Sequence, residues 1–286
     1  MLALPTNALF VTHQGQDGGA GLSPRLWGRV TGQMLTPDGQ VPGFFASDDF
    51  TNHGAVAPAI SGTTAGVIGG YGYYVDTATS ASSIKQIATA SGGVVQFSTG
   101  ATDNHETWLT SGGNTGVLGA ISDTAGSDKL TVFEARFQVG QITNTYNAFI
   151  GLSEEGLAAA DTVTDAGALA SKDLIGFWVL EADGDALNFG YRKAGQSAVT
   201  TISGVKALAA STWVKVGFVY DPKAPTSKRI AVYVDNVEQS TYVTATNIAA
   251  ATFPDGEELA FLAGVKNGSA AAHTLNVDWW AFYQER

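Results

Sequence analysis

Short runs in which apolar and polar residues alternate recur along most of this chain, with turn-forming residues between them. From Gly43 to the C-terminus these runs lack the three- and four-residue spacing of amphipathic helices. In the strongest run, 130–139, apolar residues take every second position and Glu134, Arg136 and Gln138 lie between them. The pattern predicts strands with one face in a core and the other face wetter.

The same criteria predict an all-β fold, a two-sheet antiparallel sandwich spanning residues 44–286. The last run, 275–283, carries large apolar groups on both faces and is expected to be a central strand covered on both sides. The only helix expected is short, at 154–160. The predicted strands are 82–88, 94–98, 107–110, 130–139, 148–152, 174–180, 187–192, 213–220, 230–234, 260–265 and 275–283.

Three residue pairs have the chemistry of tight turns between neighbouring strands. They are Asp183-Gly184, Asp235-Asn236 and Asn267-Gly268. Asp, Asn and Gly tolerate the positive φ angles that two-residue hairpin loops need. Each pair is therefore predicted to join two antiparallel strands.

Residues 1–43 differ from the rest, because turn-rich stretches alternate there with isolated apolar residues. We interpret this part as an extended arm. Leu22, Pro24, Trp27 and Val30 are spaced along it and cannot form a core of their own. These side chains must dock either on the sandwich of the same chain or on a neighbouring chain.

Charge and composition narrow the classes of function. The formal net charge of −11 disfavours binding to nucleic acid or to an anionic membrane surface. The absence of cysteine excludes disulfides, thiolate metal sites and cysteine nucleophiles, and it suits assembly in a reducing cytoplasm. No run has the length of a membrane span, and residues 1–12 do not read as a signal peptide, so neither membrane insertion nor export by the usual route is expected.

A series of short motifs carries a resemblance that extends over nearly the whole chain. It resembles a group of tailed-bacteriophage structural proteins with a concanavalin A-like jelly roll, and VYVDN also resembles laminin-G-type and lectin-type domains. The resemblance implies a component displayed on the head or tail of a virion. The motifs are GLSPRLWG, GFFASDDF, DNHETWLTSGGNTG, FEARFQV, FIGLSEEG, LIGFWVLEADGD, WVKVGFVYDP and IAVYVDNVEQ.

Lectin-like jelly rolls also include glycoside hydrolases, whose catalytic strand has the pattern Glu-x-Asp-x-x-Glu. The nearest match is Glu181, Asp183 and Asp185, which lacks the third carboxylate at the required step. Glu134 and Arg136, two residues apart, are expected to form an ion pair on one strand face. The sequence therefore predicts a protein that is not an enzyme.

The sequence contains little evidence for a metal or cofactor site. His13, His53, His105 and His273 have no zinc-type spacing. The glycine-rich stretch 66–74 lacks the Lys-Ser/Thr ending of a phosphate-binding loop. Calcium ligands are conceivable at 48–49 and 103–104, although ordinary turns and strand caps explain these residues better. No cofactor is expected.

Exposed tryptophans can stack on sugar rings, but most of the six tryptophans here lie inside predicted strands, where the core is the ordinary environment. Trp108, beside a Ser/Gly/Asn loop, and Trp27, in the arm, are the two not assigned to a core. Each is a candidate for contact with a glycan, and Trp108 is the predicted glycan contact.

Together these inferences predict a virion protein that decorates the capsid exterior as a homo-oligomer, assembled in the host cytoplasm. Arg25 and Arg29 balance Asp17 and Asp38 in residues 1–43, so the arm is formally neutral and residues 44–286 carry the full −11. A neutral arm suits attachment to the major capsid protein or another virion protein, through Leu22, Pro24, Trp27 and Val30. The alternatives are a tail- or head-fibre adhesin that binds host glycans and a polysaccharide depolymerase.

Overall fold

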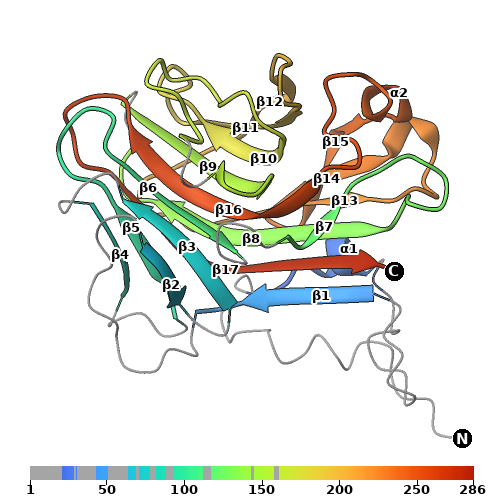
Figure 1. The fold of residues 1–286 in the computed structure, drawn as a ribbon, viewed down its shortest axis with the longest axis horizontal. Coiled ribbons are helices and arrows are strands. Elements are labelled where there is room, and N and C mark those ends of the chain that lie inside the picture. Colours follow the sequence, from blue (N-terminus) through green and yellow to red (C-terminus); the bar gives the residue numbers. More distant parts are fainter. Residues whose placement is uncertain are drawn as a thin grey trace, which may run out of the picture.

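A computed structural model describes residues 21–28, 30, 43–50, 64–68, 71–77, 82–87, 93–111, 117–142, 145–157 and 161–286. For 64–68 and 71–77 only the backbone is described. Strand is the predominant secondary structure of the described residues, and the strands form two antiparallel sheets packed face to face (Figure 1). The predicted all-β sandwich is confirmed.

The first sheet, sheet A, has eight strands among the described residues. Its order is β15-β14-β13-β8-β17-β5-β4, and β1 pairs with the C-terminal part of β17, beyond the stretch that pairs with β5. The bounds are β1 Gly43–Asp48, β4 Ser83–Gln86, β5 Val95–Ser98, β8 Thr131–Val139, β13 Val214–Tyr220, β14 Ile230–Val234, β15 Val237–Val243 and β17 Thr274–Glu285.

The second sheet, sheet B, has nine strands in the described part of the chain. Its order is β12-β11-β10-β9-β16-β6-β3-β2, and β7 pairs with the start of β16. Strand β16 curves along its length above β8 and β17 of sheet A (Figure 1). The bounds are β2 Thr64–Ile68, β3 Tyr71–Thr77, β6 Glu106–Ser111, β7 Gly119–Ala120, β9 Tyr146–Ser153, β10 Leu174–Val179, β11 Ala186–Arg192, β12 Val199–Ala207 and β16 Glu258–Asn267.

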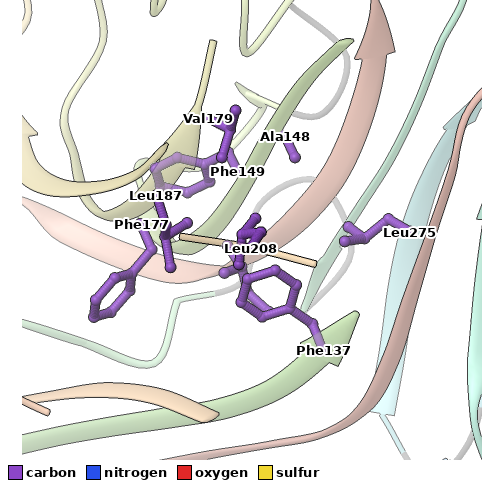
Figure 2. Close-up of a pocket in the computed structure, with 9 residues that line it drawn as sticks. Phe137, Ala148, Phe149, Phe177, Val179, Leu187, Leu208 and Leu275 are labelled. Atoms are coloured by element: carbon purple, nitrogen blue, oxygen red, sulfur yellow. The ribbon is translucent and has the colours of Figure 1, made fainter. Parts of the chain in front are cut away.

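Alternate residues of both sheets point inward and form one continuous apolar core. Near its centre the rings of Phe261 from sheet B and Trp280 from sheet A stack with their centroids 4.8 Å apart. Burying one such large side chain stabilises the fold by roughly 1.5–3 kcal/mol. A cavity of about 10 Å³ remains between the sheets (Figure 2). It has apolar walls and holds at most one water molecule, so it is not a ligand site.

Strand β17 is a central strand, as predicted for 275–283, and both of its faces are covered over its C-terminal half. Trp280 and Phe282 point into the core between the sheets. Ala281 and Tyr283 point outward, where Trp27 and its neighbours cover them. The second covering layer is therefore the N-terminal segment.

Two of the three predicted hairpin turns are confirmed. Gly184 has a φ of 66° in the turn between β10 and β11, and Asp235 and Asn236, both at positive φ, join β14 to β15. The prediction for Asn267-Gly268 is wrong, because β16 and β17 belong to different sheets. The Asn267 side chain instead donates to the carbonyls of Gly100 and Thr102, fixing the point where the chain crosses between the sheets.

The helix expected at 154–160 lies partly outside the described residues; of the described ones, 155 and 156 form a turn and Leu157 has 3-10 helical geometry. A helical turn lies instead in the segment expected to be extended: α1, Pro24–Trp27, has proline at its start, where a fixed φ and a missing N–H suit a helix. The other short helices are η4, Thr226–Lys228, and α2, Ala245–Ile248. None of the helices in the described ranges is long and apolar enough to cross a bilayer.

Candidate functional site

The outer face of sheet B is covered by the connection between β9 and β10. Trp108 and Trp178 lie on this face above glycines of the adjacent strands, Gly264 and Gly190, where a Cβ atom would meet the rings. The connection then packs over the aromatic layer. The cluster consists of Trp108, Phe149, Leu157, Val163, Leu169, Ala170, Leu174, Trp178 and Leu262. This face is thus closed by the chain itself.

A charged cluster lies at one end of this covered face. Lys266, whose side chain is 1% exposed, lies 2.7 Å from a carboxylate oxygen of Asp165, 3.5 Å from Asp161 and 3.7 Å from Glu106. Asp161 and Asp165 belong to the covering connection, while Glu106 and Lys266 belong to neighbouring strands of the sheet. The lysine therefore ties the connection to the sheet.

Glu106 is the most perturbed carboxyl of this cluster. The pKa of Glu106 is raised to about 8, mainly by burial and also by the neighbouring Asp161 carboxyl, while the Trp108 Nε1–H and Lys266 act in the opposite direction. Asp161 lies within hydrogen-bonding reach of Glu106. Glycoside hydrolases separate their two carboxyls by about 5–9.5 Å. The Glu106–Asp161 pair does not have that geometry.

Trp108, the predicted glycan contact, has no exposed surface in this structure. Its Nε1–H donates to Oε2 of Glu106 at 2.8 Å, and its ring lies under the β9–β10 connection. A sugar ring can stack on this indole only if the connection moves away. The glycan contact at Trp108 stays a prediction, and the placement gives the residue a packing role.

The outer face of sheet A is half covered, by the described part of the N-terminal arm. Glu134 on β8 accepts hydrogen bonds from the Ser23 backbone N–H, at 3.0 Å, and from Trp27 Nε1–H, at 2.7 Å. Lys215 Nζ on β13 donates to the Gly21 carbonyl at 2.9 Å. The arm was predicted to dock either on the sandwich of its own chain or on a neighbouring chain. In the structure its described part docks on the sandwich of its own chain.

The four predicted attachment residues differ in their placement. Trp27 and Val30 are buried on sheet A, and Leu22 packs partly against the same apolar cluster. Pro24 is exposed. Residues 1–20 and 31–42 lie outside the described residues, so attachment through the arm stays a prediction.

The expected ion pair between Glu134 and Arg136 is wrong. Arg136 pairs with Asp278 on the adjacent strand, and its guanidinium lies 4.5 Å from the centroid of the Trp213 ring. Glu134 is occupied by the N-terminal segment. Arg136 therefore pairs with a residue on the neighbouring strand, and Glu134 binds the docked segment, so the two side chains do not pair with each other.

The other half of this face displays a row of polar side chains, which we name the polar platform: Gln96, Arg136, Gln138, Trp213 and Asn276. On three adjacent strands Gln138, Asn276 and Gln96 are in register as direct cross-strand neighbours. Their flanking residues point into the core, so these side chains point outward. All five residues are partly exposed.

Hydrogen bonds among the platform residues fix their orientation. Gln96 Nε2 donates to Asn276 Oδ1 at 3.1 Å. In the amide orientation that satisfies both polar atoms, Gln138 donates to the Ser211 carbonyl and accepts from Trp213 Nε1, each at 3.2 Å. Each amide keeps further donor and acceptor capacity on its solvent side. The platform is therefore a pre-oriented set of donors and acceptors beside an indole.

Local residue patterns identify these platform residues only in part. Alternation along β8 placed Gln138 and Arg136 on the wetter face of the strand. Gln96 and Asn276 also stand between apolar residues, in VVQFS and LNVDWW, and the same alternation could have marked them. The five platform residues come together because of the order of the strands in the sheet. Residue spacing within one strand does not reveal that order.

The remaining candidate residues have turn-forming roles. Asp48 accepts from the Phe50 N–H at 2.7 Å, as in an ordinary Asx turn, and Asp103 accepts from the N–H of the adjacent Asn104. Asp183 accepts from the Leu180 N–H in the β10–β11 turn. No group of three metal-ligating side chains comes together within the described ranges.

No protein-family model matches the chain, and no curated protein matches it. Solved structures do. Peanut lectin aligns with a TM-score of 0.50 at 14% identity, covering 80% of this chain and 98% of the lectin chain. The fold is the concanavalin A-like jelly roll. The Emp46p carbohydrate recognition domain aligns at 0.46 and 11% identity, covering 73% and 87%.

The expectation that the chain is not an enzyme is corrected by the same comparison. An endo-β-1,4-glucuronan lyase from the fungus Trichoderma reesei aligns with a TM-score of 0.48 at 12% identity, covering 80% of this chain and 95% of the lyase. A structure of an endo-acting O-glycanase from the human gut microbiota aligns with a TM-score of 0.48 at 12% identity, covering 83% of this chain and 97% of that chain. The lack of one hydrolase motif therefore does not exclude an enzyme.

Proposed function

We propose that the chain is a surface protein of a tailed-bacteriophage particle and that its sandwich recognises glycans of the host cell surface. The polar platform is the observation that carries glycan recognition. The particle location is supported by the sequence, whose motifs resemble those of tailed-phage structural proteins.

The chemistry of the platform suits sugars. A sugar hydroxyl both donates and accepts hydrogen bonds, and a side-chain amide does the same through adjacent atoms. Gln96, Gln138 and Asn276 provide three such amides, and Trp213 adds an aromatic surface for the C–H groups of a sugar ring. Because these groups already hold one another in place, little side-chain entropy is lost on binding.

Replacing Gln96 and Asn276 together by alanine is expected to weaken glycan binding about tenfold or more. The change removes two of the three amides, and tenfold corresponds to about 1.4 kcal/mol. Binding is measured by titration calorimetry against purified host surface polysaccharide.

The matched control is Gln239→Ala on β15, which lies in the same sheet outside the platform and bonds to the Val237 carbonyl. Its affinity should equal that of the unaltered protein. Equal loss in both variants, or no loss in the platform variant, would contradict recognition at this face.

The N-terminal residues 1–43 are proposed to attach the protein, as a homo-oligomer, to the major capsid protein or another virion protein. The neutral charge of this segment, against −11 for residues 44–286, supports the proposal. The burial of Trp27 on sheet A assigns that side chain to holding the segment on its own sandwich.

Removing residues 1–20, while keeping the docked segment that follows, is expected to abolish incorporation into particles and to leave the melting temperature unchanged. Trp27→Ala is expected to release the segment and reduce incorporation in part, because a buried aromatic anchor is lost. Protein content of purified particles is the readout. Full incorporation of the truncated chain would refute attachment by this route.

A further inference from the structure

The polar platform forms a strip across the strands. Gln138, Asn276 and Gln96 are consecutive cross-strand neighbours on β8, β17 and β5. Lys85 on β4 is the cross-strand neighbour of Gln96 and extends the row at one end. Trp213, immediately before β13, extends it at the other end through its bond to Gln138. From β13 to β4 the row covers four strand spacings, about 19 Å.

The strip is bounded along one side by the docked N-terminal segment. The segment bonds to Lys215 and Glu134, which lie next along β13 and β8 from the platform. On the other side the neighbouring row carries small hydroxyl side chains on three strands, Thr274, Ser98 and Ser83, in register on β17, β5 and β4. A ligand that runs along the strands towards the segment is blocked by it, whereas a ligand that runs across the strands stays on the platform row, between the segment and the row of small side chains.

Charge at the centre of the strip is balanced. The guanidinium of Arg136 is paired with Asp278, and Lys215 lies close enough to Glu134 to affect its titration. The chain as a whole carries −11, so its long-range field repels polyanions. An uncharged ligand meets neither an unpaired charge at the centre of the platform nor this repulsion.

From these three observations we propose that the polar platform binds a linear, uncharged glycan in an extended conformation, with the glycan chain running across the strands from Trp213 to Lys85. The inference rests on the proposed function and makes its ligand class specific. One sugar ring spans about one strand spacing, so several consecutive sugar units are in contact and a terminal sugar alone fills only part of the strip.

The test measures affinity of the full chain for four homologous series: cello-, laminari-, malto- and chito-oligosaccharides, each from the monosaccharide to the hexasaccharide. In the series that binds, affinity should rise by at least about tenfold from the monosaccharide and level off once the strip is filled. Lys85→Ala and Trp213→Ala, at the two ends, should each shorten the length at which affinity levels off. Gln239→Ala should leave the length dependence unchanged, and melting curves confirm that each variant is folded.

The outcomes separate the inference from the proposed function. A monosaccharide that binds as tightly as its hexasaccharide overturns the extended mode and leaves glycan recognition in place. Tighter binding of a polyuronate than of every neutral series overturns the uncharged ligand class. If none of the four series and no host polysaccharide binds, the proposed function itself is refuted.

Discussion

Lys266→Met is expected to lower the free energy of unfolding by about 3 kcal/mol at about pH 9, above the Glu106 pKa of about 8, where this buried carboxyl is ionised. Lys266 is almost fully buried and lies beside the buried Glu106 and the two aspartates of the β9–β10 connection. Removing one member of a buried ion pair leaves the other charge without compensation, which typically costs 3–5 kcal/mol. We expect the lower end of this range of stability loss because the Asp161 and Asp165 side chains remain in contact with solvent. Urea denaturation followed by tryptophan fluorescence measures the change.

The effect of Lys266→Met should also depend on pH. Burial raises the pKa of Glu106 to about 8, so between about 4.5 and 8 the folded state binds more protons than the unfolded state and stability falls as pH rises. Losing Lys266 removes an influence that lowers this pKa. The loss of stability should therefore be larger at about pH 9 than at about pH 5.

Two variants control this prediction. Lys206→Met removes an exposed lysine that lies 3.2 Å from Asp235, and should cost no more than about 1 kcal/mol. Adding Glu106→Gln to Lys266→Met removes the uncompensated charge and should restore part of the stability. A Lys266→Met chain as stable as Lys206→Met at both pH values would show that the cluster does not hold the connection to the sheet.

The interior of the sandwich was predictable from local sequence. In β8 and β17 apolar residues at every second position face a continuous core, and period-two alternation is a local signal. Strands β12 and β15 were missed for the same reason. Both are outermost strands of their sheets with mostly exposed or half-exposed side chains on both faces, so they show no apolar alternation.

The candidate site was less predictable, because it depends on contacts distant in sequence. Glu134 was expected to pair two residues along the strand, yet its partners, Ser23 and Trp27, are more than one hundred residues away. The platform likewise requires that β5, β8 and β17 be neighbours, an order set by the topology of the sheet. Alternation marks a residue as outward, but only strand order decides which outward residues meet.

Trp108→Ala is expected to lower the free energy of unfolding by about 3–5 kcal/mol, the usual cost of truncating a fully buried tryptophan. Its position beside a Ser/Gly/Asn loop suggested a surface residue, but the β9–β10 connection folds over the ring. The substitution leaves Gly264 uncovered, removes the donor to Glu106 and opens a cavity under the connection. Thermal and urea unfolding measure the loss.

The comparison with Trp108→Phe and Trp213→Ala identifies the cause. Phenylalanine at position 108 keeps most of the ring volume and loses only the Nε1–H bond, so it should cost less than alanine. Trp213 is partly exposed on the platform, so Trp213→Ala should cost less stability and instead reduce glycan affinity. If Trp108→Ala abolished glycan binding while leaving stability unchanged, Trp108 would be a ligand contact and the β9–β10 connection would have to open during recognition.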